Sequence, residues 1–184
     1  FFVTGSKKES NFHVVDSEYR GLAALDNAKA IVIAEGYATA DTLSQALSCP
    51  VVAAFDSGNL LKVAQVLQKK YPQKPIVIAG DDDLTQESIN GKNPGKEKAM
   101  EAAQLVNGAV ILPIFAPGEQ MSQQLSDFND LANKSVLGIE AVKRQVGSVV
   151  GKVSQQAKQD SLLKLQIPIE PKQQEIKQKR ALVR

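Results

Sequence analysis

Short runs of apolar residues recur along the chain, and segments with helical spacing separate them. Continuous apolar runs of this length are typical of strands that are covered on both faces. They predict strands over residues 30–34, 50–55, 75–79 and 109–112. A shorter run at 12–15 predicts a further strand at an edge of the sheet.

The segments between these runs place apolar residues three and four positions apart, the spacing of an amphipathic helix. They predict helices that begin near Thr39 and that cover 60–67, 99–106 and 136–150. Strands that alternate with helices of about ten residues are typical of α/β folds. We therefore predict a mostly parallel central sheet of four to five strands with helices on both faces.

The composition changes near residue 152. Residues 1–151 hold 14 Lys/Arg and 17 Asp/Glu, a net charge of −3, whereas residues 152–184 hold 8 and 3, a net of +5. The second segment has little to bury, so we predict a basic, mobile linker or tail that contacts nucleic-acid phosphates or bridges to a neighbouring domain. A merely solvated linker is the alternative, and Leu162, Leu163 and Leu165 leave room for a short docked helix.

The length of 184 residues suits one ordinary domain. We assign this α/β domain to residues 1–151, with its core at about 12–150. The chain begins at Phe1 and reads as part of a longer polypeptide, so we expect other domains of a parent protein as partners.

Composition also excludes several classes of protein. No apolar stretch approaches the roughly 18 residues of a membrane span, and no signal peptide opens the chain, so we expect no membrane partner and a cytoplasmic location. The chain has a single cysteine, Cys49, which excludes an internal disulfide. With only one histidine, His13, beside it, a zinc centre is improbable. Any metal should be a hard cation that carboxylates hold.

Two predicted strands run directly into acidic residues. Glu35 follows the strand at 30–34, and Asp81, Asp82 and Asp83 follow the strand at 75–79 after one glycine. Ligands of open α/β sheets bind at the carboxyl ends of strands, and a divalent cation would relieve the repulsion among these carboxylates.

Alternation along an extended segment aims Asp81 and Asp83 the same way and Asp82 the other. The alternative is that the aspartates form a solvated turn and that Glu35 favours the dipole of the next helix. A third acidic cluster, Asp127-Phe128-Asn129-Asp130, would complete a second metal position through Asp127 and Asp130, or order its loop. The alternative is that Asp127 or Asn129 caps a helical turn.

Three motifs resemble the Toprim domain: Ile-Val-Ile-Ala-Glu-Gly-Tyr-Ala-Thr-Ala at 31–40, Val-Ile-Ala-Gly-Asp-Asp-Asp at 77–83, and Asp-Phe-Asn-Asp-Leu-Ala at 127–132. The resemblance covers about residues 12–150. It is closest to the branch found in plasmid and phage DNA primases and in primase-like regions of conjugative transfer proteins, including relaxases. The segment from Asp83 to Gly95 is longer than in bacterial replicative primases, and the zinc-binding module and amino-terminal catalytic lobe of such primases are not recognisable.

This resemblance implies that Glu35, Asp81 and Asp83 are catalytic and hold Mg²⁺ (or Mn²⁺), and that Lys96 and Lys98 are available for phosphates. The implied function is metal-dependent nucleotidyl or phosphoryl transfer in a DNA primase-like protein of plasmid replication or conjugation, with single-stranded DNA and nucleoside triphosphates as partners. The alternative is a non-catalytic Toprim-fold module that binds single-stranded DNA or a partner within a large relaxase. Retention of all three acids favours the enzyme, whereas the missing lobe favours the binding module.

Overall fold

The computed structural model of the chain describes residues 11–166. Its centre is a sheet in the order β1-β3-β2-β4-β5. The strands are β1 (His13–Val15), β2 (Ile31–Ala34), β3 (Val51–Ala53), β4 (Ile76–Ala79) and β5 (Ala109–Ile111). All neighbours pair in parallel except β1, which is antiparallel to β3 at the edge. The predicted α/β class, the five strand positions and the mostly parallel sheet are confirmed.

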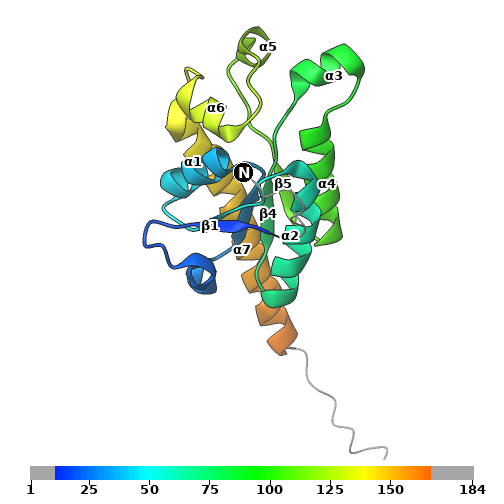
Figure 1. Ribbon diagram of the computed structural model, residues 1–184. Coiled ribbons are helices and arrows are strands. Elements are labelled where there is room, and N and C mark those ends of the chain that lie inside the picture. The colour runs from blue at the N-terminus through cyan, green and yellow to red at the C-terminus, as the bar shows by residue number, and fades with distance from the viewer. Residues whose placement is uncertain (1–10, 167–184) are drawn as a thin grey trace, which may run out of the picture.

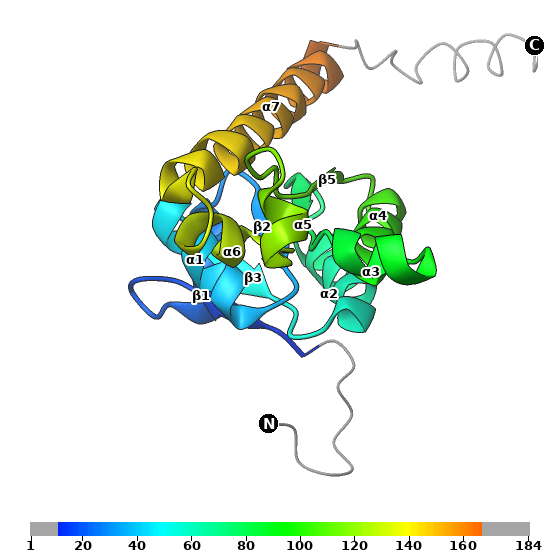
Figure 2. The ribbon, with the colours of Figure 1, turned by 90° about the horizontal axis from the view of Figure 1, so that it is seen from above.

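Helices cover both faces of this sheet (Figures 1 and 2). They are α1 (Tyr37–Leu47), α2 (Ser57–Lys70), α3 (Leu84–Asn90), α4 (Pro94–Leu105), α5 (Glu119–Gln123), α6 (Phe128–Asn133), α7 (Gly138–Gln166) and the 3₁₀ helix η1 (Gly21–Asn27). Helices α2 and α4 pack together on one face, and α1, α6 and α7 pack together on the other. The short helices α3, α5 and α6 gather at one end of the sheet, at the top of Figure 1.

The alternation of side chains along each strand builds one core on each face. In β2, Ile31 and Ile33 pack with α2 and α4, whereas Val32 and Ala34 pack with α1, α6 and α7. All four residues are fully buried. A strand covered on both faces has no polar side, which explains why the continuous apolar runs identified the strands so well.

The order of the strands reverses beside β2. The chain passes from β2 to β3 on one side through α1, and then returns to β4 on the other side of β2. At such a switch point, the loops after the two strands diverge and leave a crevice. Ala34 and Ala79 are paired at the ends of β2 and β4, so Glu35 and Gly80 begin the two loops side by side.

Helix α7 continues to Gln166, past residue 152, where the mobile tail was predicted to begin. Val149, Val150 and Val153 pack against the core, and the buried Ser154 hydroxyl donates to the Val150 carbonyl at 2.6 Å. These contacts carry the helix past the predicted boundary. Residues 167–184 of the predicted tail lie outside the described residues.

Within residues 11–166, no helix combines the length and apolar character that a membrane crossing requires.

Candidate functional site

Glu35 directly follows the buried strand β2, and it is itself partly buried. Burial raises the pKa of its carboxyl, and the charges of Asp83, Asp56 and Asp127 raise it further. A hydrogen bond from the Ser57 backbone amide, at the start of α2, acts in the opposite direction. Glu35 is therefore held at the switch point by one helix terminus, in a field of other carboxylates.

Asp81 occupies the matching position after β4. Its Oδ1 atom is buried and has no hydrogen-bond partner among the described residues. Burial, and after it the charges of Glu35, Asp127, Asp83 and Asp130, together raise the pKa of Asp81 to about 8. A buried carboxylate oxygen without a partner costs free energy, and a hard cation would satisfy it. The oxygen chemistry and the orphaned atom fit a divalent metal ion.

Asp83 is tied to the first turn of α4. Its Oδ2 accepts a hydrogen bond from the Gly95 amide at 3.0 Å. A Cβ atom on Gly95 would lie 2.9 Å from the Asp81 carbonyl oxygen and 3.1 Å from Asp83 Oδ2. Glycine is needed there because the helix start approaches the acidic loop so closely.

The middle aspartate has a different role from its neighbours. Asp82 Oδ1 accepts from Asn93 Nδ2 at 2.7 Å, and Asp82 Oδ2 accepts from Gln120 Nε2 at 3.0 Å. Both oxygens of Asp82 are therefore engaged in tying its loop to α5 and to the start of α4. That Asp82 takes no part in metal binding stays a prediction.

Asn93, which the sequence reasoning did not single out, is the hub of this loop. It is 3% exposed, and its side-chain oxygen accepts from the amides of Asp83 and Lys96. Its side-chain nitrogen donates to Asp82 and to Glu87. Asn93 is the N-cap of α4 and precedes Pro94 at the first helical position. That Asn-Pro pair predicts a helix start, but not the contacts with the aspartates.

We expect Asn93→Ala to lower the free energy of unfolding by roughly 2–3 kcal/mol, because several hydrogen bonds at a buried position are lost together. Chemical denaturation measures this change. The matched control is Asn90→Ala, which removes an exposed asparagine whose side-chain oxygen accepts one local hydrogen bond from the Lys92 amide. Equal stability of the two variants would contradict the hub role of Asn93.

Asp127 and Asp130 are both engaged in the structure around α6. Asp127 is the N-cap of that helix: its Oδ1 accepts from the Asp130 amide and its Oδ2 from the Thr39 hydroxyl. Asp130 accepts from the Ser126 amide and forms an ion pair with Lys134 at 2.7 Å. The helix-cap alternative is thus realised for Asp127. Both charges still act on Asp81, and their role as metal ligands stays a prediction.

The two lysines of the predicted phosphate contact differ. Lys98 forms an exposed ion pair with Glu101, one turn along α4, at 2.7 Å. Lys96 is partly buried in the first turn of α4, next to the Gly95 amide that binds Asp83. Lys96 therefore stands nearer to the acidic loop along the chain. A phosphate contact by either residue stays a prediction.

As they stand, no three acidic, histidine or cysteine side chains within residues 11–166 are grouped closely enough to hold a metal ion. The structure brings Glu35, Asp81 and Asp83 within electrostatic reach of one another. The backbone amides of Ser57 and Gly95 donate to the carboxylates of Glu35 and Asp83 respectively. Convergence of the three on one cation stays a prediction.

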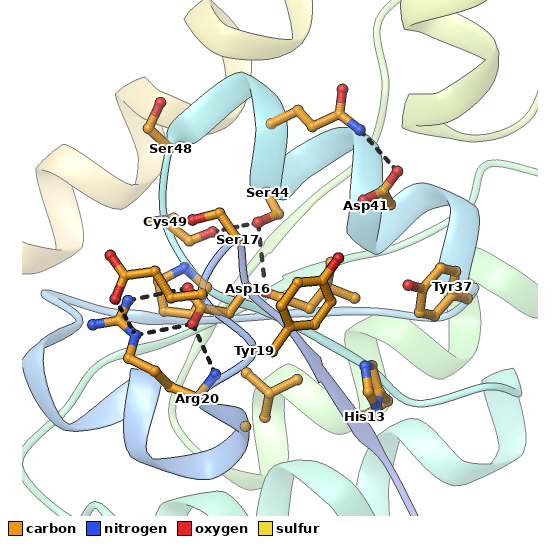
Figure 3. A pocket seen from close by; sticks show the side chains of 16 residues that line it. His13, Asp16, Ser17, Tyr19, Arg20, Tyr37, Asp41, Ser44, Ser48 and Cys49 are labelled. Atoms are coloured by element: carbon orange, nitrogen blue, oxygen red, sulfur yellow. Dashed lines mark hydrogen bonds and ion pairs between the residues drawn. The ribbon is translucent and has the colours of Figure 1, made fainter.

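A separate cavity of about 490 Å³ lies beside β1 and α1 (Figure 3). The rings of His13 and Tyr37 contact each other on one side, with centroids 5.7 Å apart, and Tyr19 is 94% exposed. The Arg20 guanidinium donates two hydrogen bonds to the Asp16 carboxylate, and these close the loop that contains Tyr19. The carboxylates of Asp16, Glu18 and Asp41 line this cavity with only Arg20 to balance them, so it does not favour phosphate.

The fold and the site together define an α/β domain with an acidic centre at the switch point of its parallel strands. Residues 30–136 match the Toprim domain, and the chain belongs to this family. The resemblance inferred from the sequence motifs is confirmed.

Two relatives support the primase branch of that family. Both are named DNA primase TraC and come from Escherichia coli. One is 42% identical, over 83% of this chain and 19% of the relative. The other is 39% identical, over 86% of this chain and 14% of the relative. This chain thus spans less than a fifth of either relative. No solved structure was found to match it.

Proposed function

We propose that this domain is the metal-dependent nucleotidyl-transfer centre of a DNA primase-like protein. The observation that carries the proposal is the buried, unpartnered Oδ1 of Asp81, in a cluster of carboxylates at the sheet's switch point. The Toprim family and the two primase relatives support it. Single-stranded DNA as template, nucleoside triphosphates as substrates and a role in plasmid or conjugative DNA processing belong to the same proposal.

Glu35, Asp81 and Asp83 would hold Mg²⁺ or Mn²⁺. When bound, such an ion supplies positive charge that neutralises triphosphate oxygens and favours in-line attack. Asp81 would contribute the buried oxygen that lacks a partner. Asp83 would contribute a carboxylate oxygen while its Oδ2 accepts the hydrogen bond from the Gly95 amide. Because Asn93 and Gln120 hold Asp82, the loop between these two ligands is already ordered.

Glu35 has the environment that a general acid or base needs. Burial and the neighbouring carboxylates raise its pKa, which moves the group toward the pH at which it can both accept and release a proton. The Ser57 amide fixes the position of the carboxyl. Glu35 would then take the proton of an attacking hydroxyl, or act as a further metal ligand.

The test uses the full-length parent protein in a primer-synthesis assay on a single-stranded template. We expect Glu35→Gln to reduce the rate about 10²–10⁴-fold, the usual contribution of a general acid–base group. Glu140→Gln is the control, since Glu140 is an exposed residue of α7. If Glu35→Gln retains the wild-type rate, the catalytic proposal fails, and the binding-module alternative is favoured.

A further inference from the structure

A parallel sheet has two ends, and their charges differ here. The acidic centre lies at the carboxyl ends of β2 and β4. The segments that enter β2, β3, β4 and β5 lie at the opposite, amino end, and α7 passes them on its way out of the domain (Figure 1). Lys29 and Lys74 stand just before β2 and β4 respectively. This amino end contains no residue of the proposed metal site.

Three adjoining cavities open at the amino end, with volumes of about 630, 510 and 400 Å³. The first and second share Lys29, Ser154 and Lys158 as lining residues. The second and third share Lys74 and Ala157. These three cavities have common walls along the second half of α7, and together we call them the basic groove. At its far end the first cavity also shares Arg20, Ser48, Cys49 and Pro50 with the acidic cavity beside β1.

The charged lining of the basic groove is almost entirely positive. Its charged residues are Arg20, Lys29, Lys74, Lys158 and Lys164, with Asp160 as the single acid in the lining. Three of these basic residues, Arg20, Lys29 and Lys74, belong to residues 1–151, which carry a net charge of −3.

Most of this positive charge is available to a ligand. Lys74 donates to the backbone carbonyl oxygens of Asp26 and Ala28 and forms no ion pair within residues 11–166. Lys29 and Lys158 form no ion pair within residues 11–166. Arg20 is the exception, because Asp16 and Glu18 already pair with it. The Asp26 carboxylate near Lys74 accepts a hydrogen bond from the Tyr71 hydroxyl.

The shape of the groove suits an extended ligand. Gly151 on α7 has open space where a side chain would project, and Ser154 and Ala157 continue this low surface along the helix. Lys158 and Lys164 lie six residues apart on α7, or about 9 Å along its axis. Lysines are point charges on flexible stems, so they contact phosphates in many registers and do not read base edges.

We propose that the basic groove binds the sugar–phosphate backbone of single-stranded nucleic acid, independently of sequence. This contact goes beyond the proposed metal chemistry, because it lies at the other end of the sheet and uses none of the same residues. The groove gives the domain a site that holds a nucleic-acid strand. The acidic centre, which repels phosphate unless a cation is present, lies apart from this site.

The test measures binding of the 184-residue chain to a fluorescent 20-nucleotide oligo-dT by anisotropy, over a series of salt concentrations. The test variant is Lys29→Glu/Lys158→Glu. The control is Lys143→Glu/Arg144→Glu, which makes the same charge change at exposed positions of α7 outside the groove. Thermal unfolding of both variants checks that the fold is retained.

We expect the groove variant to bind at least tenfold more weakly at 0.1 M salt, and the control about threefold at most. Release of counterions by two phosphates contributes about 1.4 to the slope of log affinity against log salt for single strands, so the slope should flatten by about that amount. Equal losses in the two variants, or an unchanged slope, would overturn the proposal.

Two further arms separate this proposal from others. Asp81→Asn/Asp83→Asn should retain oligo-dT binding, so failure of the metal site and failure of the groove are distinguishable. Polyglutamate of equal charge should compete at least tenfold less well than unlabelled oligo-dT. Equal competition would assign the groove to acidic polypeptides and overturn the assignment to nucleic acid.

Discussion

Replacing Asp81 with asparagine is expected to stabilise the metal-free domain at neutral and alkaline pH. The carboxyl titrates near its ordinary pKa of about 3.9 in the unfolded chain, but at about 8 in the folded domain. Between these values the folded state keeps a proton that the unfolded state has released. The free energy of unfolding therefore falls as the pH rises through this window, and asparagine removes that dependence.

The size of the effect follows from the size of the shift. Each pKa unit corresponds to about 1.4 kcal/mol, and rearrangement of the loop reduces the full value, so we expect Asp81→Asn to gain roughly 3 kcal/mol at pH 8. At pH 4 the gain should fall to roughly 0.5 kcal/mol or less, because the folded carboxyl is then protonated and the unfolded one is already about half protonated. Urea unfolding in EDTA at pH 4, 6 and 8 measures it.

Asp160→Asn is the matched control for this experiment. It removes an exposed carboxylate of α7 whose hydrogen-bond partner is Gln156 on the same helix, so its effect should be small at every pH. If Asp81→Asn and the wild type lose stability equally between pH 4 and pH 8, Asp81 is not a buried and strained carboxyl.

The second large effect is expected at Gly80, where β4 enters the acidic loop. A Cβ atom there would lie 2.4 Å from Ala99 Cβ, on the fully buried side of α4. Neither atom can rotate away, so α4 must shift, and the Gly95 amide that binds Asp83 shifts with it. We expect Gly80→Ala to cost about 2–3 kcal/mol in the free energy of unfolding.

A double-mutant cycle makes this prediction specific. Ala99→Gly alone should cost about 1 kcal/mol through helix propensity, but it removes the atom that Gly80→Ala meets. The double variant should therefore be more stable than the sum of the single effects predicts. Gly151→Ala is the control, because its new Cβ meets nothing within 4 Å. Simple additivity at Gly80 and Ala99 would refute the close approach.

The sheet was predictable because each strand is buried on both faces and carries an unbroken apolar run. The end of α7 was not, because residues 154–166 alternate Gln, Lys, Ser and Ala with few apolar side chains. That composition is equally typical of a solvated linker, and only contact with the core decides between them. The buried Ser154 shows how a polar residue can still belong to the packed face of the helix.

The candidate site was predictable to a similar degree. A carboxylate after a buried strand is visible in the sequence, and parallel strands bring Glu35 and Asp81 to one end of the sheet. The contacts of Asp82 with Asn93 and Gln120 span 11 and 38 residues. These hydrogen-bond partners depend on how α4 and α5 pack, so no local sequence pattern predicts them. The same holds for Thr39 and Asp127, which are 88 residues apart.

The most direct test of the account is calorimetric titration of the metal-free chain with Mn²⁺ at pH 7.5. The wild type should bind the ion with release of protons, because Asp81 is largely protonated without metal. Asp81→Asn/Asp83→Asn should show no binding heat while keeping its fold, and Asp160→Asn should bind as the wild type does. Unchanged Mn²⁺ affinity in the double variant would contradict the metal site at Glu35, Asp81 and Asp83.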